Sequence, residues 1–287
     1  MAKTDVAQAK STAVGAAYDY GDMSHSGFED TTINDLSIPF VNVLQTNSPE
    51  VEDQTIEGAK AGDLLNSVTK EIMTQPLRVI PVHKEEVWVG WRPRNQGGGV
   101  MGRYEPDSAE VKAVIKANGG SRIPPKGADG KRIPFKGPDG CEMVETYYVY
   151  CLILDEEGTT VDSYCVLAFS STKIKVQKDW MTAMYTQKGR PPMFANRARV
   201  STVKQKNNDG SFFNFAIHPF ADTWRESLIN PGENMALLEE AKDFRDMILN
   251  GLAKPDFDSV TGSDDGSSGG SSGSGGSGSS DDDEMPF

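Results

Sequence analysis

The feature that most constrains this chain is a long segment with nothing to fold around. Residues 262–280 are almost entirely Gly and Ser, interrupted only by Asp264 and Asp265. Such a segment has no apolar surface to offset the entropy that an ordered backbone loses. We therefore expect residues 255–280 to form a flexible linker that joins a folded body to the terminal residues 281–287.

The rest of the chain has the length of one domain with elaborations. Residues 1–30 are mostly small, polar or acidic, which predicts a flexible N-terminal arm. Residues 31–254 then form the globular domain. This chain has no signal-peptide pattern and no apolar run of about 18 residues, so we expect a soluble, cytoplasmic protein, in the host cytoplasm if a phage encodes it.

The cysteines argue against a disulfide framework or a Cys-rich zinc site. Their number is odd, and Cys141, Cys151 and Cys165 show no CxxC spacing. Reduced thiols fit this pattern better. No cofactor or metal is expected.

Alternating apolar residues predict a domain rich in β-structure. The short runs 77–81 and 87–91 are separated by charged residues at 84–86. Two hairpins are expected, formed by 145–154 with 160–169 and by 197–206 with 212–218. Helical spacing predicts helices over 171–187 and 233–252, and a brief one over 109–116 inside a Gly- and Pro-rich excursion, 95–140, that we place outside the core.

This order of elements indicates a fold class. A hairpin, a helix and a second hairpin suit a small barrel of the OB type. We therefore predict a mainly β fold with added helices (α+β), that is, an OB-like barrel with a long basic insertion near 95–140 and a disordered acidic C-terminal tail.

The net charge of −13 argues at first against a nucleic-acid ligand. Its distribution reverses that reading. Residues 255–287 carry eight acids and no Lys or Arg, so −8 of the −13 lies in the tail and −5 remains for residues 1–254. The window 173–206 holds nine Lys and Arg residues against Asp179 alone, a net +8. A basic stretch beside an acidic tail is the informative pattern.

The tip of the tail has the most specific signal. It reads Asp281, Asp282, Asp283, Glu284, Met285, Pro286 and Phe287. A basic pocket with an apolar slot would bind both the carboxylates and the terminal Phe. The tip resembles the acidic C-terminal peptide of bacterial single-stranded DNA-binding proteins, which also ends in an acidic run, an apolar residue, Pro and Phe after a Gly-rich linker. Single-stranded DNA-binding proteins of tailed phages similarly end in acids and a terminal Phe.

The resemblance covers about 30 residues, and Glu284 departs from it by extending the acidic run. It implies a tail that recruits replication or recombination proteins such as a polymerase, helicase, primase or nuclease. A purely solubilising acidic tail is the alternative.

Binding of single strands needs cations for the phosphates and flat side chains for the bases. Arg197 and Arg199, and with a bulge also Lys204 and Lys206, are expected on one face of a strand. A core position is the alternative for each aromatic residue. The candidate DNA-binding residues are Lys84, Trp88, Trp91, Arg92, Arg94, Tyr148, Tyr150, Lys173, Lys175, Lys178, Trp180, Arg190, Arg197, Arg199, Lys204, Lys206, Phe213 and Phe215.

Catalytic signals are weak. The three histidines are scattered, and no phosphate-binding loop, dinucleotide fingerprint, HExxH or GxSxG motif occurs. We therefore expect a non-enzymatic protein that coats and protects single-stranded DNA, with no membrane partner. A strand-annealing recombination protein is the alternative, followed by a nuclease or a polymerase accessory protein. Self-association stays open.

Overall fold

The structure is a computed structural model that describes residues 27, 29–31, 35, 37–93, 96–128, 130, 132–207, 210–255 and 257. Most of the expected N-terminal arm, the Gly/Ser segment and the acidic tip lie outside these residues. Within the described part, no helix is long and apolar enough to cross a membrane.

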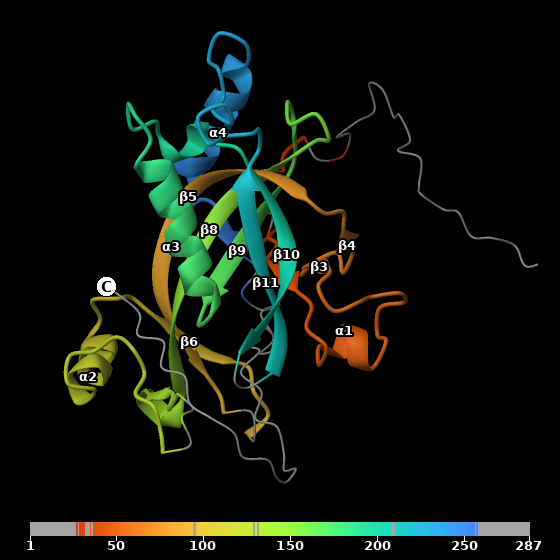
Figure 1. The fold of residues 1–287 in the computed structure, drawn as a ribbon. Helices are drawn as coiled ribbons and strands as arrows, with labels where there is room; N and C mark the ends of the chain where they lie inside the picture. Colours follow the sequence, from red (N-terminus) through yellow and green to blue (C-terminus); the bar gives the residue numbers. More distant parts are fainter. Residues whose placement is uncertain are drawn as a thin grey trace, which may run out of the picture.

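The fold is mainly β with a few helices, as the sequence predicts (Figure 1). Both expected hairpins, the helix between them and the final helix are present. The strands are β1 (Ser37–Ile38), β2 (Val41–Val43), β3 (Leu64–Asn66), β4 (Ile72–Met73), β5 (Leu77–Trp91), β6 (Val100–Tyr104), β7 (Phe135–Lys136), β8 (Glu142–Leu154), β9 (Val161–Ser170), β10 (Ala198–Asn207), β11 (Gly210–Pro219) and β12 (Lys254–Pro255). The α-helices are α1 (Pro49–Glu52), α2 (Ala109–Ala117), α3 (Lys173–Tyr185) and α4 (Met235–Leu249), and the 3-10 helices are η4 (Pro138–Gly140) and η5 (Met193–Ala195).

The long strand β5 organises the main sheet. Its first residues pair with β10, its last residues pair with β6, and β8 pairs along its other edge. A register shift between Pro81 and His83 lies between these two regions. Proline is tolerated at such a bulge because it cannot donate to a regular ladder.

The sequence pattern separates two short strands at residues 84–86, and this prediction is wrong. The strand continues through these residues because each charged side chain there has a partner. Lys84 Nζ lies 4.7 Å from the ring centre of Tyr147. The Tyr150 hydroxyl donates to Glu85 at 2.6 Å, and Glu86 pairs with Arg122. The charges therefore sit within one continuous strand.

The expected barrel closure is not seen. Antiparallel strands follow the order β11-β10-β5-β8, with β9 on the far side of β8, and no ladder among the described residues joins β9 to β11. The sheet is therefore open at this seam.

Residues around β2 fill the open seam. On one side, Val166 N of β9 donates to Pro39 O at 2.9 Å. On the other, the Gln45 side chain donates to Phe213 O at 2.9 Å and accepts from Phe213 N at 2.8 Å. The side-chain amide of Gln45 thus pairs with Phe213 of β11 as the backbone of a neighbouring strand would. It satisfies an N–H and a C=O that an edge strand would leave without partners.

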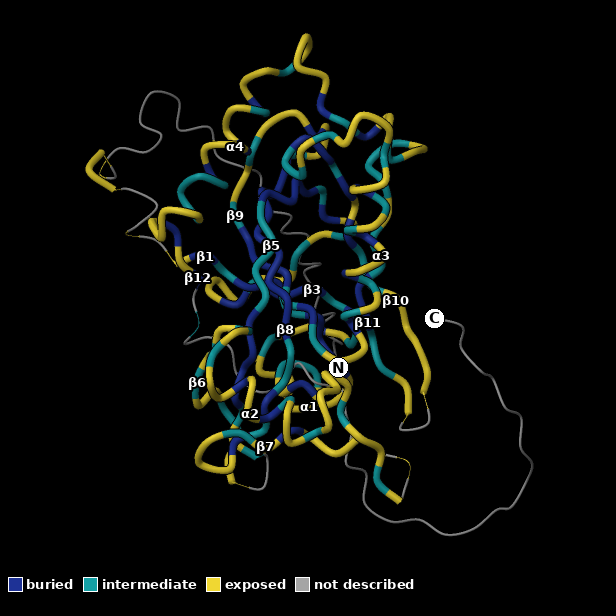
Figure 2. The backbone as a smooth tube through the Cα atoms, turned by 90° about the vertical axis from the view of Figure 1, so that its left-hand side faces the viewer, coloured by how far each residue is buried: buried dark blue, intermediate teal, exposed yellow. Residues whose placement is uncertain are grey.

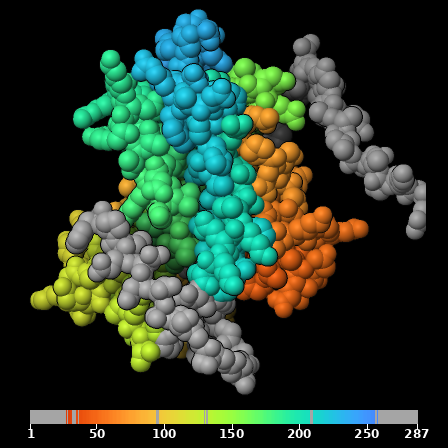
Figure 3. Space-filling view, viewed as in Figure 1, coloured from red at the N-terminus to blue at the C-terminus, as the bar shows by residue number. Residues whose placement is uncertain are grey.

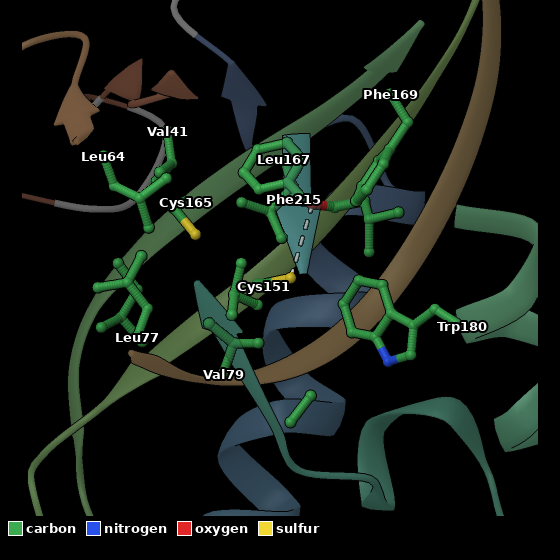
Figure 4. Close-up of a cluster of buried hydrophobic side chains, with 14 of the residues drawn as sticks. Val41, Leu64, Leu77, Val79, Cys151, Cys165, Leu167, Phe169, Trp180 and Phe215 are labelled. Carbon is green, nitrogen blue, oxygen red and sulfur yellow. Dashed lines mark hydrogen bonds between the residues drawn. The ribbon is translucent and has the colours of Figure 1, made fainter. Parts of the chain in front are cut away.

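Side chains pack on both faces of β8, so the sheet is a middle layer. The odd-numbered side chains of β8 from Tyr147 to Ile153 join a core with β9, β10, β11 and α3, part of which is drawn in Figure 4. The even-numbered ones from Tyr148 to Leu154 join a second core beneath α4. Figure 2 shows α3 and α4 on opposite sides of β5 and β8.

The excursion was expected outside the core, and part of it is core. Val111 and Val114 of α2 and Phe135 of β7 bury Trp88 at the far end of β5. The helix expected at 109–116 is present as α2, but it packs on the sheet.

Candidate nucleic-acid interface

Most of the aromatic residues expected to stack on bases are inside the protein. Trp88 is 0% exposed, and the four others that are buried are Tyr148, Tyr150, Trp180 and Phe215. Trp91 and Phe213 are partly buried against the two main cores. Except for Tyr148, whose ring contacts that of Phe257, the assignment of these side chains to a stacking surface is therefore corrected: both faces of the sheet are covered, so an alternating aromatic points into a core on either side.

Three of the expected DNA-binding cations are buried or partly buried and make contacts within the protein. Lys173 is buried, with its Nζ 5.5 Å from the ring centre of Phe215. Arg197 donates to Ser227 O at 3.2 Å and to Gly158 O at 3.1 Å, and burial lowers the pKa of its guanidinium. Lys84, partly buried, lies over Tyr147. These contacts give all three a role in the fold.

The bulge expected in the strand at 197–206 is absent. The ladder between β10 and β11 runs without a register shift from Ala198 to Asn207. Because alternate residues of a strand face opposite sides, Arg199 lies on one face, and Lys204 and Lys206 lie on the other. The expected single row of four cations is wrong.

Except for Arg199, whose Nε donates to Pro219 O at 3.1 Å, the exposed cations within residues 173–206 lie on α3, the loop after it and the far end of β10. None of them lies within 4.0 Å of a carboxylate oxygen among the described residues. Together with one exposed aromatic, Tyr185, they form what we call the basic strip: Lys175, Lys178, Tyr185, Lys188, Arg190, Lys204 and Lys206.

The spacing along α3 explains its two faces. Lys173, Gln177, Trp180 and Met184 recur at helical intervals and are buried. The residues at 175, 178, 182 and 185 recur on the opposite side and are exposed. An amphipathic helix of this kind buries its apolar stripe and presents its charges to solvent.

Sequence reasoning missed Tyr185. Its side chain is 67% exposed, and Arg190 Cζ lies 5.3 Å from its ring centre. The spacing along the helix could have identified it. Tyr185 lies ten residues after Lys175 and seven after Lys178, which places all three on one helical stripe.

The elements that carry the two parts of the basic strip are neighbours. Asn214 Nδ2 of β11 contacts Thr172 O before α3 at 3.4 Å and Gln205 Oε1 of β10 at 3.1 Å. The start of α3 therefore lies against this end of the hairpin through the face that carries Val203 and Gln205, while Lys204 and Lys206 lie on the other face. Figures 1 and 3 show α3 (green) beside this hairpin (teal) on the face toward the viewer.

Two cations of the basic insertion are held in ion pairs. Arg122 pairs with Glu86 and, at 2.9 Å, with Glu145, and these carboxylates raise the pKa of its guanidinium against the opposing effect of burial. Lys136 pairs with Glu142 at 2.9 Å. Arg92 and Lys126 are exposed, and Arg94 lies outside the described residues.

A second feature lies beside the final strand. The ring of Phe257 contacts the rings of Phe40 and Tyr148, and the guanidinium of Arg103 covers it. Burial raises the pKa of Tyr148 to about 12, against the opposing effect of Arg103, so this tyrosine stays neutral.

No group of three or more His, Cys, Asp or Glu side chains within the described part could hold a metal ion. The three described cysteines are buried, and none of them forms a disulfide. The partner-binding residues expected at 281–287 lie outside the described residues.

Comparison with known proteins gives one result. A family model described as "Pam3 phage gp34-like protein" matches residues 7–254, which span the folded body and end before the Gly/Ser segment. The match supports a phage origin. Comparisons with curated proteins and with solved structures found no match.

Proposed function

We propose that this chain, which belongs to the Pam3 phage gp34-like family, binds and protects single-stranded DNA during replication or recombination. In this proposal the acidic tip at 281–287 recruits partner proteins. The tip lies outside the described residues, so that part rests on its resemblance to the C-terminal peptides of single-stranded DNA-binding proteins.

The basic strip is the observation that carries the proposal. A ligand that meets unpaired cations and an exposed ring is expected to be anionic and to have flat groups, and single-stranded nucleic acid has both. Two lysines and Tyr185 share one stripe of α3, so phosphates and a base could be contacted along one line.

The order of the strands supports an OB-type domain. In chain order, β5, β8, β9, β10 and β11 pair as 3-2-1-4-5, and α3 lies between the third and the fourth. An OB barrel has this strand order and binds oligonucleotides near its second and third strands and two flanking loops. The corresponding loops here are the excursion after β5 and the tip of the β10–β11 hairpin.

A binding assay with single-stranded DNA, duplex DNA and RNA of one length tests the proposal. We expect the single strand to bind more tightly than the duplex, with log affinity falling by roughly 0.7 per phosphate contact as log salt rises. Equal affinity for single strand and duplex, or a flat salt response, would refute it.

Matched variants locate the interface. Lys175→Ala with Lys178→Ala removes two cations of the basic strip and should lower the salt slope by about 1.4. Tyr185→Ala should cost about 1–3 kcal/mol of binding if a base stacks there. The control, Lys60→Ala with Lys242→Ala, removes the same charge from other exposed positions and should change little. An equal loss in the control would remove the basic strip as the interface.

A further inference from the structure

The aromatic contact at the end of the folded body has an unusual occupant. Phe40 and Tyr148 form an edge-to-face pair with ring centres 5.4 Å apart. The ring of Phe257 lies 5.8 Å from the first and 5.9 Å from the second. Arg103 Cζ lies 3.2 Å from the centre of the Phe257 ring. One flat ring is therefore held between a guanidinium and two aromatic side chains.

The walls of this slot belong to the body of the domain. Tyr148 is on β8 and Phe40 bridges to Val166 of β9, and both are almost completely buried. Arg103 is on β6, opposite Val89 of β5. Strand ladders thus hold Tyr148 and Arg103, and the bridge to Val166 with two hydrogen bonds to Ser67 holds Phe40.

The occupant is attached more weakly. Phe257 is only partly buried, and it follows β12, which has a two-residue parallel ladder with β1. Segments with few paired residues open at low free-energy cost. Phe257 is therefore better placed to leave the slot than any of its walls.

The chemistry of the slot suits a nucleobase. Proteins hold unstacked bases between aromatic side chains and arginine guanidinium planes, and a phenyl ring imitates a pyrimidine in this setting. The slot lies on β8, the second strand of the OB-type order, where such domains bind oligonucleotides.

We propose that Phe40, Tyr148 and Arg103 form a base-stacking subsite that Phe257 fills in the absence of DNA. This inference rests on the proposed function. A base entering the slot displaces Phe257. The observed affinity therefore equals the intrinsic affinity multiplied by the fraction of molecules in which the slot is empty. Displacement also frees β12 and Phe257, after which the chain continues to the Gly/Ser segment, so DNA binding lengthens the tether of the tail.

The test compares an oligothymidylate with an abasic strand of the same length, which has the phosphates without the bases. Phe257→Ala empties the slot, and we expect its affinity for oligothymidylate to rise at least about fivefold, with no change for the abasic strand. Arg103→Lys keeps the charge and loses the flat guanidinium. It should weaken binding of oligothymidylate and spare the abasic strand.

The outcomes separate this inference from the proposed function. If the native chain does not bind single strands, the proposed function fails. If it binds them through the basic strip while Phe257→Ala alters neither ligand, or alters both equally, the base-stacking subsite is wrong and the function stands.

Hydrogen exchange of the native chain keeps the test decisive if a variant folds poorly. Oligothymidylate should speed exchange of the amides at Ala253 and Lys254, because β12 loses its anchor. Unchanged or slower exchange at these amides under saturating DNA would overturn the proposal.

Discussion

Trp88 lies on β5 with its indole completely buried, and the centre of its ring system is 5.5 Å from that of Phe135. Trp88→Ala should therefore lower the free energy of unfolding by about 3–5 kcal/mol, measured by urea denaturation. The protein that remains folded should bind single-stranded DNA normally. Trp88→Phe is the matched control, and it should cost much less because the indole Nε1 is a buried donor without a partner among the described residues. A stable Trp88→Ala protein with weakened DNA binding would show that a base reaches this side chain.

At the scale of elements, two contacts hold the β-structure together where sequence patterns give little indication of it. One is Gln45, which is 4% exposed and closes the seam on β11. Gln45→Ala leaves the N–H and C=O of Phe213 without this partner, and we expect a loss of about 1–3 kcal/mol in the free energy of unfolding. Gln96→Ala, at an exposed position after β5, should change stability far less. Equal stability of the two variants would mean that the seam does not depend on the amide.

The other contact is the turn between β8 and β9. Partial burial raises the pKa of Asp155, but hydrogen bonds from the backbone and hydroxyl groups of Thr159 and Thr160 dominate and hold it at about 2. A folded-state pKa below the ordinary value of about 3.9 stabilises the fold above that value, and this stabilisation is lost as pH falls toward 2. Asp155→Ala should lower the melting temperature at pH 7. Near pH 2 its melting temperature should approach that of the native chain. A constant difference across this range would contradict the ionic role of Asp155.

At the scale of the whole molecule, charge is divided between the basic strip on the body and the acidic end of the chain. Deleting residues 281–287 should abolish partner recruitment and leave DNA affinity unchanged or higher, most visibly at low salt, where screening of the acidic competitor is weak. Phe287→Ala keeps the acids, so it should lose the partner without changing DNA affinity. Pull-down and binding assays on the same preparations measure both effects. A truncated chain that binds DNA more weakly and still captures the same proteins would contradict this view of the tail.

Local sequence patterns were sufficient to predict the main hairpins and helices. The hairpins β8–β9 and β10–β11 were predictable because alternation and turn residues act within about twenty residues of sequence. Helices α3 and α4 were predictable for the same reason, from the spacing of apolar residues and the glycine and proline that follow α4. The division of charge between residues 173–206 and the tail also required only the sequence.

The tertiary structure alone decided which way the side chains face. Alternation divides a strand into two faces, but it does not say whether one or both are covered, and here α3 and α4 bury opposite sides of β8. For that reason Trp88 and Tyr150 became interior residues, while Tyr185 remained in solvent. The seam at Gln45 and the slot around Phe257 join residues more than a hundred positions apart, and only packing could bring such distant groups together.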